Sequence, residues 1–225
     1  MRRFDGQLVP SFSGKRYGDA GLPDNSITFN LTGVAGQSFG TFLSKGITIN
    51  LNGVANDYVG KGMSGGKIIV KPLLQGSDYA GAGNTCLYGA TGGKLYVRAN
   101  VGERFAVRNS GTIAVVEGTG DSPCEYMTGG IVVILGKTGI NFGAGMTGGL
   151  AFIYDDKREF IDNMNQELIE ALRIDTDDTE LERIYLKNLL KDYVAHTDSE
   201  KAQNILDHFR SEIRNFWMVK PKDMK

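Results

Sequence analysis

The chain has 225 residues and a formal net charge of −1, and its length suffices for one large domain with a hydrophobic core. The sequence has no run of five or more like charges, so a nucleic acid is not an expected partner. No apolar stretch reaches the 18 residues that a membrane span needs. The apolar region of a signal peptide does not follow Arg2 and Arg3 either, so we expect a cytoplasmic protein without a membrane partner.

The distribution of glycine divides the chain into two regions. All 31 glycines lie at or before Gly149. Residues 1–154 carry 13 Lys or Arg against 9 Asp or Glu, whereas residues 155–225 carry 12 against 17. We therefore predict a glycine-rich domain over residues 1–154, whose first 24 residues form a lead-in, and a helical extension over residues 155–225.

The glycine-rich region contains an internal repeat. Residues 27–40 (ITFNLTGVAGQSFG) align with residues 47–60 (ITINLNGVANDYVG) at an offset of 20. Further units close on Gly46, Gly66, Gly93, Gly111, Gly130 and Gly149, with spacings of 20, 27, 18, 19 and 19. A period near 19, with four or five β-branched or aromatic residues opening each unit, is typical of a solenoid. The unit of 27 is the same coil with a loop inserted over residues 73–83.

This repeat predicts an all-β solenoid, specifically a single-stranded, right-handed parallel β-helix of about seven coils with a C-terminal helical appendage. Seven coil-opening strands are expected near Ile27, Ile47, Ile68, Leu95, Ile113, Ile131 and Leu150. Glycine permits the positive φ that a corner needs. We assign corner roles to Gly33, Gly36, Gly40, Gly53, Gly60, Gly66, Gly93, Gly111, Gly130, Gly136, Gly139, Gly143 and Gly149.

Residues 155–225 show helical signals. Two capping boxes, Thr179 with Glu182 and Thr197 with Glu200, each precede an amphipathic run. The first run has apolar residues at Leu181, Ile184, Tyr185, Leu189 and Tyr193, and the second extends to Trp217. Because open strand edges promote aggregation, we expect these helices to cover the last coil or its side. Phe209, Phe216 and Trp217 are the expected buried contacts.

Two glycine clusters match the G-x-G-x-x-G dinucleotide fingerprint, at Gly60, Gly62 and Gly65 and at Gly143, Gly145 and Gly148. That fingerprint requires a helix after it, whereas each cluster here precedes a strand-like run. We interpret both clusters as corner glycines. The sequence around Gly136, Lys137 and Thr138 resembles the end of a phosphate loop, but its glycine spacing is wrong and no helix is expected after it.

The remaining candidates for chemistry have simpler interpretations. Cys86 and Cys124 lack metal-site spacing and are expected to be buried thiols without a disulfide. His196 and His208 are expected on helix surfaces or caps. Glu103 and Asp121 fall at similar positions of adjacent coils, where two carboxylates could act as acid and base, but we interpret them as solvated loop acids. We predict no catalytic, cofactor-binding or metal-binding residues in this chain.

Several segments resemble the C-terminal GXGXG domain of the glutamate synthase large (alpha) subunit. In the glycine-rich region these segments are residues 15–27, 35–46, 53–68, 83–111 and 125–136, which include AGQSFGTFLSKG and EYMTGGIVVILG. In the tail they are residues 182–209 and 216–223, the latter reading FWMVKPKD. At the corners Asn56, Ala106 and Cys124 replace glycines of the ideal repeat, so we expect some coils to turn less tightly.

The resemblance implies a right-handed β-helix that is structural and docks the amidotransferase and FMN/iron-sulfur synthase parts of glutamate synthase. It implies an excised domain or a split-gene subunit of an oxidoreductase, with FMN and the iron-sulfur cluster bound by other parts of that enzyme. One alternative is a protein similar to the β-helix component of formylmethanofuran dehydrogenase, which fits the tail less well. Another is a stand-alone polysaccharide-active β-helix enzyme that uses Glu103 and Asp121.

Overall fold

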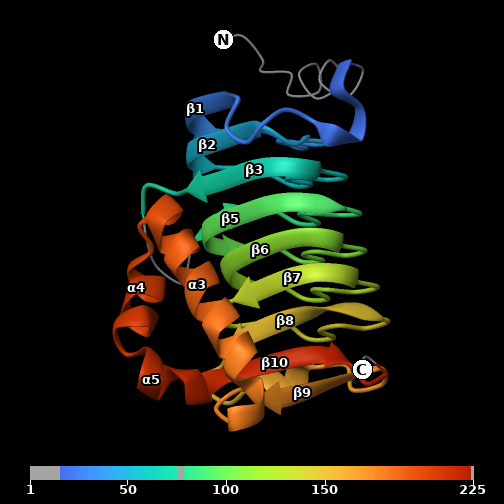
Figure 1. Cartoon of the computed structure of the whole chain (residues 1–225), viewed down its shortest axis with the longest axis vertical. Coiled ribbons are helices and arrows are strands. Elements are labelled where there is room, and N and C mark those ends of the chain that lie inside the picture. Colours follow the sequence, from blue (N-terminus) through green and yellow to red (C-terminus); the bar gives the residue numbers. More distant parts are fainter. Residues whose placement is uncertain (1–15, 75–78, 224–225) are drawn as a thin grey trace.

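The structure is a computed structural model that describes residues 16–74 and 79–223, and it is a β-solenoid flanked by helices (Figure 1). Within these residues, seven stacked strands form the parallel part of one sheet, which β10 and β9 continue. They are β1 (Ile27–Val34), β2 (Ile47–Val54), β3 (Ser64–Lys71), β5 (Gly92–Val101), β6 (Ser110–Thr119), β7 (Thr128–Ile134) and β8 (Gly148–Tyr154). Each pairs in parallel with the next, and the short β4 (Ala80–Ala82) pairs with β5.

The predicted fold class is confirmed, with a small difference in the number of coils. In the described chain, seven strands joined by six successive parallel pairings make about six turns rather than seven. The chain does not complete a seventh parallel turn there, because the strands stacked beyond β8 are antiparallel. The right-handed sense of the coil stays a prediction.

Each of the six turns in the described coil contains three left-handed residues at alternate positions. In one turn Arg104, Ala106 and Arg108 have φ values of 56°, 58° and 56°. The other five sets are Ser38, Gly40, Phe42; Tyr58, Gly60, Gly62; Thr85, Leu87, Gly89; Ser122, Cys124, Tyr126; and Asn141, Gly143, Gly145. A conformation that usually favours glycine is thus imposed on all kinds of side chains, because each turn hydrogen-bonds to its neighbour.

The expectation that substituted corners turn less tightly is wrong. Ala106 and Cys124 have φ values of 58° and 60°, close to those of the glycines at equivalent positions. Their backbone amides donate to Cys86 O (2.9 Å) and Phe105 O (2.7 Å) of the preceding coil, which fixes the geometry. Asn56 has a different role, since its side-chain Oδ1 accepts a hydrogen bond from Asp57 N at 2.9 Å.

The glycines with predicted corner roles fall into two groups. Nine have positive φ, namely Gly33, Gly40, Gly53, Gly60, Gly66, Gly93, Gly130, Gly143 and Gly149. Gly36, Gly111, Gly136 and Gly139 do not. At Gly111 a Cβ would lie 2.1 Å from Thr91 O, so this position needs glycine because two backbones approach closely.

The C-terminal region contains strands as well as the expected helices. Its elements are α2 (Phe160–Asn163), β9 (Ile169–Arg173), α3 (Glu180–Thr197), α4 (Glu200–Asp207), α5 (Phe209–Glu212) and β10 (Phe216–Pro221). The second helical run was predicted to reach Trp217, which is wrong, because Phe216 and Trp217 belong to β10. This strand pairs antiparallel with β8 and with β9. Strand pairing completes the backbone hydrogen bonds along the β8 edge, which a helix cannot do.

The three aromatic contacts predicted for the tail are buried to different degrees. Phe216 is fully buried, whereas Phe209 and Trp217 are half-buried. Phe216 and Phe209 pack with the core outside the sheet, and Trp217 packs with the core inside the coil. Alternate residues of β10 therefore face the two cores, as the pleat of a strand requires.

The helix boundaries also differ from the two predicted capping boxes. Thr179 precedes α3, but its Oγ1 donates to Thr176 O at 2.9 Å and makes no cap hydrogen bond. Thr197 is the last residue of α3. The cap of α4 is Ser199, whose Oγ accepts from Ala202 N at 3.2 Å.

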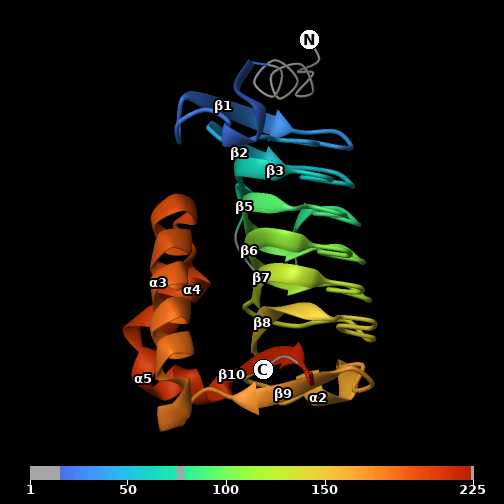
Figure 2. The same ribbon diagram turned by 45° about the vertical axis from the view of Figure 1, so that its right-hand side comes forward.

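The sheet has a hydrophobic core on each of its two faces. Inside the coil, residues such as Ile49, Val70 and Val97 are buried. On the outer face, a second cluster joins strand residues to residues of α3 and α4, and it includes Tyr96, Val115, Val133, Phe152, Leu186, Leu190 and Ile205. Figure 2 shows α3 running alongside the stacked strands, so the helices cover the side of the coil while β10 and β9 cover its end.

Candidate functional site

The two cysteines are buried free thiols, as expected. Cys86 and Cys124 are both 0% exposed. Burial raises the pKa of the Cys86 thiol to about 12, and it also raises the pKa of Cys124. Because the thiolate is the reactive form, neither cysteine is available as a nucleophile at neutral pH.

Glu103 and Asp121 lie at an exposed corner where polar side chains anchor the next coil. Asn84 Oδ1 accepts from Glu103 N at 2.8 Å, and Asp121 Oδ1 accepts from Ile140 N at 2.9 Å. Asp57 Oδ1 likewise accepts from Asn84 N at 2.7 Å. The Asp121 carboxylate thus satisfies a backbone amide of the coil, which favours a structural role for it over acid or base chemistry.

The glycine clusters that match the dinucleotide fingerprint lie in turns that lead into strands. Gly60 and Gly62 are left-handed turn residues before β3, and Gly143 and Gly145 are their equivalents before β8. Because a strand follows each cluster, neither cluster meets a helix N-terminus that could receive a pyrophosphate. The turn that contains Lys137 and Thr138 also leads to a strand, β8.

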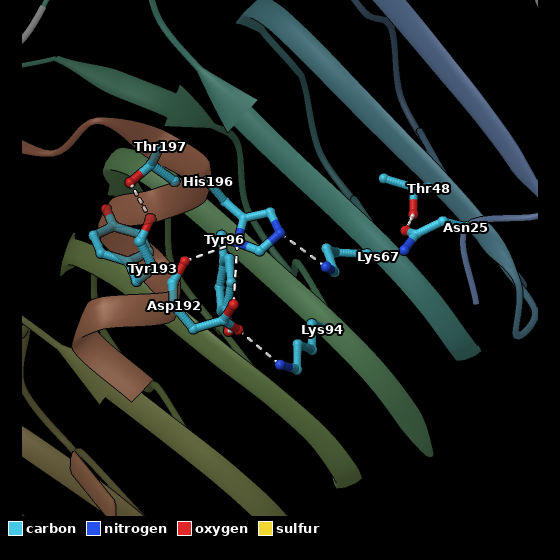
Figure 3. A network of polar contacts seen from close by, with 9 residues as sticks. All are labelled: Asn25, Thr48, Lys67, Lys94, Tyr96, Asp192, Tyr193, His196 and Thr197. Carbon is cyan, nitrogen blue, oxygen red and sulfur yellow. Dashed lines mark hydrogen bonds and ion pairs between the residues drawn. The ribbon is translucent and has the colours of Figure 1, made fainter. Parts of the chain in front are cut away.

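The main polar cluster that joins distant parts of the chain lies between the sheet and the C-terminal end of α3 (Figure 3). Asp192 Oδ2 accepts from Lys94 Nζ at 2.7 Å and from Tyr96 Oη at 2.6 Å. On the next turn of α3, His196 Nδ1 lies 3.2 Å from Asp192 Oδ1, and its Nε2 lies 2.9 Å from Lys67 Nζ. We call these five residues the seam cluster.

The electrostatics of the seam cluster favour an ionised Asp192. Burial disfavours its charged form, but hydrogen bonds from Lys94 and Tyr96 outweigh burial, so its pKa lies below the ordinary value. Burial, together with the hydrogen bond to Asp192, raises the pKa of Tyr96. The Tyr96 phenol therefore stays a donor, and the cluster is a charge-assisted link between helix and sheet.

Further contacts fix the end of α3 beside the seam cluster. Arg98 Nη1 donates to Thr197 O at 3.0 Å, and Tyr193 Oη donates to Val97 O at 2.9 Å. Ser199 Oγ donates to the buried Glu117 carboxylate at 2.6 Å. A cation at the carbonyl end of a helix also interacts favourably with the helix dipole. The end of α3 is therefore held firmly on β5 and β6.

The two histidines have different surroundings, although the sequence predicts a helix surface or cap for both. His196 is partly buried and lies against Lys67, which is 129 residues away in the chain. His208 matches the prediction, since it is exposed and its Nδ1 lies 3.1 Å from Asn204 O. The two histidines have similar sequence surroundings, and their environments differ only because α3 packs on β3 and β5. The seam cluster therefore has no clear signal in the sequence.

An open groove of about 450 Å³ runs across the strands on the side of the seam cluster. It is lined by Lys45, Lys67 and Lys94, together with Asp24 and Ser64. Five glycines also line it, namely Gly46, Gly65, Gly66, Gly93 and Gly111. Lys67 and Lys94 thus belong both to this groove, which we call the lysine groove, and to the seam cluster.

Metal sites and membrane-spanning helices are absent from the described part of the chain. Within residues 16–74 and 79–223, no group of three or more His, Cys, Asp or Glu side chains is arranged to hold a metal ion. In the same ranges, no helix has the length and apolar character needed to cross a membrane.

Comparison with known proteins identifies the family. A family model described as GXGXG motif matches residues 1–222. The chain belongs to the GXGXG family. It is 49% identical over 220 residues to the ferredoxin-dependent glutamate synthase of Pyropia yezoensis, a match that covers 96% of this chain and 14% of that protein. It is 47% identical over 230 residues to the glutamate synthase [NADPH] large chain of Bacillus subtilis, a match that covers 99% of this chain and 15% of that protein.

A third relative shows the same relation of lengths. The chain is 48% identical over 215 residues to the glutamate synthase [NADH] of Schizosaccharomyces pombe, and this match covers 94% of the chain and 10% of that protein. The GXGXG chain thus spans between a tenth and about a seventh of the length of these relatives, which contain other regions besides. The sequence resemblance to the glutamate synthase large subunit is confirmed.

Proposed function

We propose that this chain is a structural and docking module of glutamate synthase, the enzyme that forms glutamate from 2-oxoglutarate and glutamine. The observation that carries the proposal is identity of 47–49% along almost the whole chain to proteins named glutamate synthase. The module spaces and docks the amidotransferase part and the synthase part. FMN and the iron-sulfur cluster belong to those partners, and the assembly is cytoplasmic.

The range of relatives supports a role that is independent of the electron donor. The matched proteins are named for ferredoxin, NADH and NADPH, yet their identities to this chain lie between 47% and 49%. The region is thus found in enzymes named for each of the three donors, which suits a role that does not depend on the donor. The extended coil instead offers a rigid body of stacked strands, which suits a spacer.

The charge-assisted contacts at the seam support the same role. They fix α3 to the sheet at Lys94, Tyr96 and Lys67, so the outer surface of the helix keeps one position relative to the coil. A docking module needs such a preorganised surface, because ordering side chains at the moment of association costs affinity.

Affinity purification of the tagged chain from its native source tests the proposal. We expect it to be recovered with polypeptides that contain flavin and iron-sulfur clusters, and we expect the complex to form glutamate from glutamine and 2-oxoglutarate. Flavin absorbance, iron content and product analysis provide the measurements. Recovery of the chain alone, with a hydrolase or lyase activity of its own, would contradict the proposal.

A further inference from the structure

The lysine groove contains cations that the stacking of the coil does not require. Lys67 and Lys94 are register partners on β3 and β5, and Lys45 precedes β2 on the coil before them. Gly65 must be glycine, since a Cβ there would lie 2.6 Å from Lys45 N. The packing of the coils thus explains this glycine, whereas it does not explain the three lysines.

The charges around the lysine groove are unbalanced. Its lining has three lysines against the single carboxylate of Asp24, which leaves a formal charge of +2. Lys94 has a carboxylate partner in Asp192, at 2.7 Å. Among the residues that the structure describes, neither Lys45 nor Lys67 has a carboxylate oxygen within 4.0 Å. With Asp192 counted beside the lining, three ammonium groups stand against two carboxylates, so a formal charge of +1 remains and the groove presents a positive potential.

The seam cluster holds two of these ammonium groups in place. Lys94 Nζ is bound by Asp192, and Lys67 Nζ by His196 Nε2, so both side chains reach toward α3 (Figure 3). An ammonium group has three donors, and each of these contacts uses one. Both lysines also line the groove, so a ligand there would bind them without the full entropic cost of ordering a free lysine.

We propose that the lysine groove binds an acidic, extended segment of another glutamate synthase polypeptide, an inference that rests on the proposed function. The groove crosses β2, β3, β5 and β6, so three strand spacings of about 4.8 Å give it a length of about 14 Å, or about four extended residues. Carboxylates of the segment bind the three ammonium groups.

Charge reversal tests the proposal. Lys45→Glu is the first variant, because Lys45 is exposed and its side chain makes no ion pair among the described residues. The double variant Lys45→Glu/Lys67→Glu is the second, and Lys137→Glu/Lys157→Glu is a matched control at exposed lysines outside the groove. Each variant is mixed with the amidotransferase and synthase polypeptides, and binding is measured at several salt concentrations. Thermal unfolding verifies that each variant is folded.

The expected results separate the two proposals. The double variant should bind at least about tenfold more weakly and with a smaller salt dependence, whereas the control should stay within about twofold of the wild type. If the folded double variant binds as the wild type does, the assignment of the groove is wrong while the docking function stands. If the wild type binds neither polypeptide, both proposals are wrong.

A second measurement identifies the occupant. Reaction of Lys45 and Lys67 with an amine-modifying reagent should be suppressed when the partner polypeptides are added to the wild-type chain. Inorganic pyrophosphate serves as the small-anion probe and should give no protection at concentrations comparable to the protein. Protection by pyrophosphate and not by the polypeptides would make the groove a small-anion site and overturn the proposal.

Discussion

The outer face of the sheet changes character partway along one column of register partners. From β1 to β8 this column has Asn30, Asn50, Ile69, Tyr96, Val115, Val133 and Phe152, and Met218 of β10 continues it. Asn30 is exposed and Asn50 is half-buried, whereas Ile69 is 2% exposed and the four residues after it are 0% exposed. The backbone is the same throughout, so the difference lies in what covers it.

The apolar part of the column begins at β3, a strand against which α3 packs. On β1 and β2, where no described helix lies above the sheet, Asn50 Nδ2 donates to Asn30 Oδ1 at 2.8 Å. The two regions show that a stacked coil supports either a polar face open to water or an apolar face under helices. Stacking of the coils alone does not determine whether the outer face of the sheet is polar or apolar. The side chains on that face can therefore be changed without altering the coil.

Removal of a large side chain from the covered part should have the largest effect. We expect Phe152→Ala to lower the free energy of unfolding by about 3–5 kcal/mol, because Phe152 is fully buried between the sheet and the helices. Urea unfolding followed by circular dichroism measures the change. A loss below about 1 kcal/mol would mean that the helices do not depend on this core.

The turns allow a second comparison, between the last coil and the first. Gly143→Val places a β-branched residue at φ +71°, with its Cβ 2.4 Å from Ile169 Cδ1, and should cost about 1–3 kcal/mol. Gly36→Ala is the control, since Gly36 is outside the left-handed region and a Cβ there would meet open space. Equal melting temperatures for both variants would contradict the assignment of Gly143 to a strained corner.

The seam cluster should contribute less, because Asp192 is partly exposed to water. We expect Asp192→Asn to cost about 1 kcal/mol at neutral pH through weaker hydrogen bonds to Lys94 and Tyr96. The pKa of Asp192 is lowered in the folded state, so its stabilisation is present above the unfolded-state pKa and disappears as the pH falls through the folded-state pKa. The variant and wild type should therefore converge in acid, and a constant difference at every pH would count against this link.

The smallest effect is expected on the open face of the first coils. Asn50→Ala removes the hydrogen bond to Asn30, which is exposed to water, and should change stability by less than about 0.5 kcal/mol. Differential scanning calorimetry of Asn50→Ala beside Phe152→Ala compares the two regions directly. Similar losses from the two substitutions would show that the first coils are packed more tightly than the exposure of Asn30 indicates.

The solenoid could be predicted from the residues alone, because stacking repeats the same demands in every coil. Strands recur near a period of 19 because each coil must bring its apolar residues back into register with the previous coil. The positions of Gly53 and Gly66 follow from positive φ and close backbone approach, which are local requirements. The buried thiols and the strands after each glycine cluster could be predicted for the same reason.

The way in which the C-terminal region folds onto that coil depends on contacts between distant residues. Helix α3 has apolar residues on two faces, and the sheet buries Leu186 and Leu190, leaving Leu181 at 78% and Ile184 at 50% exposed. Phe216 and Trp217 suit a helix or a strand, and the edge of β8 makes them a strand. The seam cluster joins residues about a hundred positions apart, so its chemistry arises only once α3 has docked.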